Sequence, residues 1–66
     1  MIYHNLKAAM TSAGITQKTI AQTMGVREST VTDWFSGKHS IKLETALEMR
    51  DKLFPNEGIE DLFARE

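Results

Sequence analysis

Apolar residues recur three or four positions apart in short segments along the chain, a spacing that is typical of amphipathic helices. Glycine and proline separate the segments and suit helix ends. The pattern predicts helices over about residues 3–13, 17–24, 28–36 and 43–54, followed by a short closing helix that contains Ile59, Leu62 and Phe63.

The third of these segments needs a second criterion, because its threonine and valine content would also permit a strand. Val31, Trp34 and Phe35 stand at helical spacing, and glycine follows the segment at position 37. A helix is therefore favoured, with these three side chains on its inner face. Trp34 accordingly reads as a core residue rather than a surface for stacking on bases.

No strand pattern appears in the chain, so the fold class expected is all-α, a compact domain of five helices spanning residues 1–66. Sixty-six residues are too few for a second core. The apolar positions of the predicted helices and joints supply the expected core: Leu6, Met10, Ile15, Ile20, Ala21, Met24, Val26, Val31, Trp34, Phe35, Ile41, Leu43, Leu47, Leu53, Ile59, Leu62 and Phe63.

Composition restricts the class of protein. With 41% apolar and 26% charged residues the chain is typical of a globular domain. It has no cysteine, which excludes disulfides and thiolate metal sites. No apolar run approaches the roughly 18 residues of a membrane span, and the N-terminus lacks the apolar block of a signal peptide. We therefore expect a complete, cytoplasmic protein without contact to membranes.

The net charge of −1 conceals an uneven distribution along the chain. Residues 1–42 carry five basic and two acidic side chains, a net charge of +3, whereas residues 43–66 carry a net charge of −4. Such asymmetry between halves is a hint of nucleic-acid contact. The alternative is chance, since so few charges are involved.

Residues 16–37 are the most informative part of the chain. The predicted second and third helices are separated by only three residues, 25–27. A helix-turn-helix needs a small residue where the helices cross and a residue tolerant of positive φ in the turn, and Ala21 and Gly25 satisfy these needs. Apolar residues at matched positions would then hold the crossing together: Ile20, Met24, Val26, Val31 and Trp34.

This stretch resembles the Cro/repressor (XRE) helix-turn-helix family of phage and bacterial regulators, with a motif at about residues 17–36. Gln17, Ala21 and Gly25 match the family's spacing, as do Val31 and Trp34, and the likeness extends over about residues 3–64. It implies a lambda-repressor-like fold and a sequence-specific regulator of transcription. Small members of the Cro type bind a palindromic operator as a homodimer.

The resemblance also implies roles for particular residues. The third helix would read base edges in the major groove of double-stranded DNA with Glu28, Ser29, Thr30, Thr32 and Asp33. Side chains around that helix would contact phosphates: Gln17, Lys18, Arg27, Ser36, Lys38 and Lys42. His39 lies in a loop from which some relatives reach a base.

Glu28 departs from familiar members of the family, which carry glutamine at this position. A carboxylate only accepts hydrogen bonds, so it favours the amino group of cytosine, whereas glutamine pairs with adenine at two points. Two hypotheses stay open: Glu28 reads cytosine, or it orients Arg27 toward a phosphate or guanine. Asp33 is a second unusual acidic residue on the same helix.

One small module contacts few bases, so dimerisation is expected on energetic grounds. The candidate dimer interface consists of four apolar residues near the C-terminus, which have simple core packing as the alternative: Phe54, Ile59, Leu62 and Phe63.

No other chemistry is predicted. The sequence contains neither a nucleophile with a base and an acid nor a glycine-rich phosphate loop, so no enzyme is expected and there are no catalytic residues to name. His4 and His39 stand far apart without companion ligands, so neither a metal nor another cofactor is expected.

Two alternatives to a Cro-like repressor stay open. An antitoxin of the same fold would bind a toxin through its acidic C-terminal half and regulate its own operon. A protein-interaction module would have lost DNA binding, which the near-neutral charge, Glu28 and Asp33 would favour. The acidic and basic side chains of the fourth segment, Glu44, Glu48, Asp51 and Lys52, form either a solvated face or a partner surface.

Overall fold

A computed structural model of the chain describes residues 2–65 and contains five helices in that range, with no strand among those residues. This confirms the predicted all-α class. The helices are α1 (His4–Ala13), α2 (Gln17–Met24), α3 (Glu28–Ser36), α4 (Leu43–Leu53) and α5 (Ile59–Leu62). The bounds of α2 and α3 are those predicted, while α1 begins one residue later and α4 ends one residue earlier than expected.

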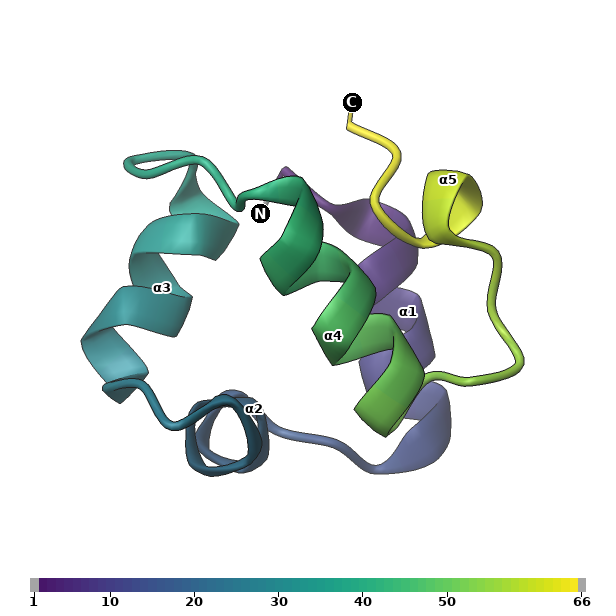
Figure 1. Cartoon of the computed structure of the whole chain (residues 1–66), viewed down its shortest axis with the longest axis horizontal. Helices are drawn as coiled ribbons and strands as arrows, with labels where there is room; N and C mark the ends of the chain where they lie inside the picture. The colour runs from purple at the N-terminus through teal and green to yellow at the C-terminus, as the bar shows by residue number, and fades with distance from the viewer. Residues whose placement is uncertain (1, 66) are drawn as a thin grey trace.

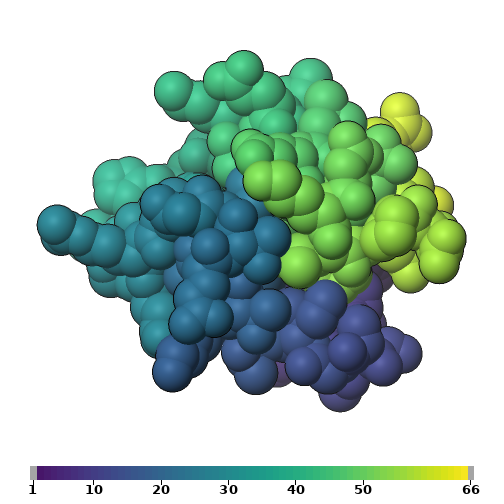
Figure 2. Space-filling view, turned by 60° about the horizontal axis from the view of Figure 1, so that its bottom comes forward, coloured from purple at the N-terminus to yellow at the C-terminus, as the bar shows by residue number. Residues whose placement is uncertain are grey.

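The helices pack around a single core, with α3 at one side of the molecule and α5 at the other (Figure 1). Helix α2 packs against both α3 and α4, while α5 packs against α1 and α4. Figure 2 shows the face on which α2 lies between the start of α3 and α4. The motif helices therefore occupy one side of the domain, and α1, α4 and α5 support them.

Two contacts of the N-terminal segment and α1 with distant elements close the fold. The backbone N–H of Ile2 donates to the carbonyl of Phe35 at 3.0 Å, which ties the start of the chain to the end of α3. The side-chain amide of Asn5 donates to the carbonyl of Asp61 at 2.8 Å, which ties α1 to α5. The two bonds therefore hold the end of α3 against the N-terminal segment and α5 against α1.

Most of the predicted core is confirmed, since all of its residues except Leu43 are buried or half-buried. The prediction for Leu43 is wrong, because its side chain is 70% exposed. Leu43 is the first residue of α4, and helical side chains lean toward the N-terminus of their helix. It therefore extends past the packed turns toward the preceding loop.

Four further buried residues were missing from the predicted core: Tyr3, Ala46, Met49 and Phe54. Met49 is fully buried on α4, where Ala46 precedes it by three residues on the same face. Tyr3 packs edge-on against Phe63, with ring centroids 5.8 Å apart. Tyr3 and Phe54 were expected at the ends of the first and fourth helices but lie just outside α1 and α4, so the packing of these flanking residues decides their burial.

Candidate nucleic-acid interface

Helix α3 has a buried face and a polar face, as the spacing of its residues predicts. Val31, Trp34 and Phe35 are buried in the core. Of the five residues predicted to read bases, Glu28, Ser29 and Thr32 are exposed, and the other two, Thr30 and Asp33, are half-buried. The burial of one side thus leaves a row of hydrogen-bonding side chains on the other.

The joint between α2 and α3 has the expected helix-turn-helix geometry. Ile20 and Ala21 are buried where α2 packs against α3. Gly25 ends α2 with φ of 69°, in the left-handed region that a residue with a Cβ rarely adopts. The N–H of Val26 donates to the carbonyl of Ala21 at 3.0 Å, which satisfies a helix-end carbonyl and turns the chain toward α3.

Gln17 and Thr32 are joined across the motif, a contact that the sequence did not predict. The hydroxyl of Thr32 on α3 donates to Oε1 of Gln17, the first residue of α2, at 2.9 Å. The sequence predicts phosphate contact for Gln17 and base reading for Thr32. They are 15 positions apart, so only the packing of α2 against α3 brings them together.

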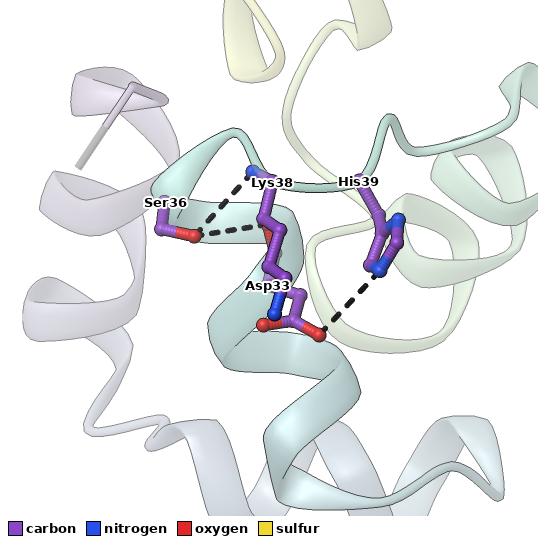
Figure 3. A network of polar contacts seen from close by, with 4 residues as sticks. All are labelled: Asp33, Ser36, Lys38 and His39. Atoms are coloured by element: carbon purple, nitrogen blue, oxygen red, sulfur yellow. Dashed lines mark hydrogen bonds and ion pairs between the residues drawn. The ribbon is translucent and has the colours of Figure 1, made fainter.

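Four residues meet at the end of α3, namely Asp33, Ser36, Lys38 and His39 (Figure 3). The carbonyl of Asp33 accepts from the Ser36 hydroxyl at 3.2 Å and from the N–H of His39 at 3.2 Å, and Ser36 Oγ accepts from the N–H of Lys38 at 3.4 Å. His39 Nε2 stands 3.8 Å from Asp33 Oδ2. The loop that carries Lys38 and His39 is therefore held against the last turn of α3.

The basic residues around α3 are available for anions. Lys18, Arg27, Lys38 and Lys42 are exposed. Within residues 2–65 the acidic side chains that have a basic neighbour are Asp33 beside His39, Asp51 beside Arg50 and Glu48 beside Lys52, so these four cations have no acidic partner there. In particular, no ion pair joins Arg27 to its neighbour Glu28 in the described part of the chain.

The candidate dimer interface is divided by the fold. Phe54 and Leu62 are only 4% and 1% exposed, so they belong to the core of the chain itself rather than to an accessible surface. Ile59 and Phe63 are half-buried and line a groove of about 430 Å³, whose wall also includes Ile41 and the exposed Leu43. The apolar surface at this end of the molecule is thus partly different from the one expected.

Within residues 2–65, no helix is both long and apolar enough to span a membrane.

Comparison with known proteins agrees with this geometry. Searches of curated proteins and of solved structures gave no significant match. A family model described as helix-turn-helix matches residues 6–54, which is more than half of the chain and includes the whole of α2 and α3. The chain therefore belongs to the XRE-type helix-turn-helix family of DNA-binding regulators.

Proposed function

We propose that this protein is a sequence-specific transcriptional regulator that inserts α3 into the major groove of its operator. The observation that carries the proposal is the division of α3 into a buried apolar face and an exposed polar face. Exposed Ser and Thr side chains can donate or accept hydrogen bonds to base edges, and the exposed carboxylate of Glu28 can accept from an amino group.

Phosphate contacts would supply most of the affinity. DNA binders gain affinity by releasing counterions when lysine and arginine side chains neutralise phosphates. Lys18 and Gln17 stand at the start of α2, Arg27 just before α3, and the remaining candidates, Ser36, Lys38 and Lys42, follow in the last turn of α3 and the loop beyond it. The two acidic residues of α3 repel the phosphates of DNA, so the flanking groups have to provide the electrostatic attraction to the DNA backbone.

A homodimer on a palindromic operator is the form of binding that we propose, in the manner of a Cro-like phage or prophage repressor. Half-sites of such operators lie about 34 Å apart. The chain measures 26 × 24 × 22 Å along its principal axes, so two copies bound one helical turn apart would be close neighbours. The groove lined by Leu43, Ile59 and Phe63, whose wall also includes Ser40, Glu60 and Arg65, is the surface through which they could pair.

Selection of bound sites from random duplex DNA tests the proposal. We expect enrichment of a two-fold symmetric motif, whose occupancy falls steeply as salt rises. A lack of enrichment at low salt would contradict DNA reading and favour a protein-interaction module. Enrichment of a single half-site would contradict the dimer alone.

A pair of lysine variants tests the orientation on DNA. Lys18→Gln should weaken binding to all sequences alike and lower the slope of log affinity against log salt by about 1.8, the value for one phosphate contact in each copy of the proposed dimer. Lys52→Gln is the matched control, because Lys52 is on α4 and pairs with Glu48 at 2.7 Å. Its salt slope should equal that of the wild-type chain.

A further inference from the structure

The hydrogen bond between Thr32 on α3 and Gln17 on α2 determines how the Thr32 hydroxyl can interact with DNA. A hydroxyl has one proton and two acceptor lone pairs. Thr32 donates its proton to Gln17 Oε1 at 2.9 Å, while its side chain stays on the exposed face of α3. The oxygen therefore has only lone pairs left for a base.

From this we infer that Thr32 is a specificity-determining residue that reads DNA as a hydrogen-bond acceptor and selects a base with an exocyclic amino group. The inference rests on the proposed function. In the major groove, cytosine N4 and adenine N6 are the donors, whereas guanine O6 and N7 and thymine O4 only accept. Guanine or thymine opposite the oxygen would leave two acceptors facing each other.

The side chain of Glu28, one helical turn before Thr32, is also a hydrogen-bond acceptor. Glu28 precedes Thr32 by four residues, and residues at this spacing share one face of a helix. Both are exposed, and a carboxylate only accepts. Glu28 and Thr32 thus form a row of two acceptors along the reading face, which favours adjacent bases that carry amino groups.

Gln17 is a positioning residue in this arrangement. Its amide has an acceptor, Oε1, and a donor, Nε2. A phosphate oxygen only accepts, so Nε2 is the group that can bind phosphate while Oε1 accepts from Thr32. The phosphate contact and the polarity of Thr32 are therefore coupled through one amide group.

The experiment begins with the sites that the wild-type chain selects, and compares them with sites selected by Thr32→Val. The position whose preferred base changes is the one that Thr32 reads. That base is then replaced by its analogue without the amino group: 2-pyrimidinone for cytosine or purine for adenine. We expect the wild-type chain to bind the analogue about threefold to tenfold more weakly, the range of one hydrogen bond. Thr32→Val should bind both duplexes equally.

Three further variants distinguish base reading by the Thr32 hydroxyl from an indirect structural effect of the substitution. Thr32→Ser keeps the hydroxyl and should restore the amino preference. Gln17→Leu frees the hydroxyl proton, so the preferred base should widen to include guanine or thymine, together with a general loss of affinity. Thr11→Val is the matched control, because Thr11 also donates its hydroxyl proton, to the Lys7 carbonyl on α1, outside the motif. Its selected sites should be those of the wild-type chain.

The outcomes distinguish this inference from the proposed function. If the wild-type chain enriches no site, the proposed function fails and the inference with it. If the wild-type chain enriches a two-fold site but Thr32→Val selects the same bases, the inference alone is overturned. Guanine or thymine at the position that Thr32 reads overturns it as well.

Discussion

Glu28 and Asp33 are the two acidic residues of α3, and the structure gives them different surroundings. Glu28 is exposed and has no ion pair within the described residues. The Asp33 side chain is only 30% exposed and stands beside His39, which is itself 65% exposed. Glu28 is therefore the carboxylate that is free to meet a base, while Asp33 contributes to the end of α3.

Glu28→Gln should change the preferred base at one operator position from cytosine to adenine. The glutamine amide can both donate and accept, so it pairs with adenine N6 and N7 at two points, a contact that discriminates by about 1–3 kcal/mol. Competition binding with single-base operator variants measures the change. Glu44→Gln, at an exposed position on α4, is the control. An unchanged base preference would show that Glu28 does not read DNA.

Gly25→Ala should lower the free energy of unfolding by about 1–2 kcal/mol, the cost of the left-handed conformation for a residue with a Cβ. A Cβ at position 25 would meet nothing within 4 Å, so the cost is one of backbone conformation and not of steric overlap. Urea denaturation measures it. Gly25→Asn should cost less, because asparagine tolerates this region better.

Gly58→Ala is the control for this series. Gly58 precedes α5 with φ of −73°, which alanine adopts readily, and a Cβ there would stand 3.4 Å from Asp61 Oδ2. Because Gly58 is the N-cap of α5, where alanine is less favourable than glycine, we expect a loss of stability, but a smaller one than at position 25. If Gly25→Ala were equally mild, the turn between α2 and α3 would have to change conformation in the variant.

At the scale of the helix, the start of α2 is set by its capping residue, Thr16. Thr16 has an extended backbone, and its Oγ1 accepts from the N–H of Thr19 at 3.2 Å. The cap satisfies one of the donors left free at the helix start. It also holds the turn that carries Gln17, and so the amide that contacts Thr32.

Thr16→Ala should therefore destabilise the protein by about 1 kcal/mol, the usual cost of losing an N-cap. Chemical denaturation followed by circular dichroism measures the change, and Thr16→Ser should recover most of it. Thr11→Ala provides the contrast, because Thr11 lies inside α1 and its hydroxyl bonds only to the preceding turn. Alanine is the better helix former there, so stability should stay equal or rise.

At the scale of the whole molecule, apolar surface is left uncovered at one end. Leu43 is 70% exposed beside the groove that Ile59 and Phe63 line. Burial of this exposed apolar surface against a second copy would be favourable. This surface is where we expect the second copy of the dimer to pack.

Leu43→Glu should weaken the proposed dimerisation about a hundredfold or more, since each of the two copies would lose the burial of a leucine, about 1.5–3 kcal/mol. The stability of the single chain should change little, because the side chain is exposed. Sedimentation equilibrium and binding to a two-fold operator measure the effect. Ala8→Glu adds the same charge at an exposed position on α1, outside this groove. Equal effects of the two variants would exclude a specific interface at Leu43.

The sequence by itself determined the helices, the ends of α2 and α3 and the inner face of α3. These features depend on neighbours within a few positions: the period of Val31, Trp34 and Phe35, the cap at Thr16 and the positive φ at Gly25. Local rules of helix geometry and capping apply to such short separations. The family pattern depends on the same residues, which is why the fold and the motif could be predicted together.

Only the tertiary structure decided which residues meet across helices. It paired Gln17 with Thr32, buried Phe54 and Leu62, and left Leu43 outside the core. These outcomes depend on how far each helix extends past its neighbour and on how it is rotated, which periodicity does not specify. For the same reason the sequence could indicate the polar face of α3, whereas the acceptor role that we infer for Thr32 depends on the packing of α2 against α3.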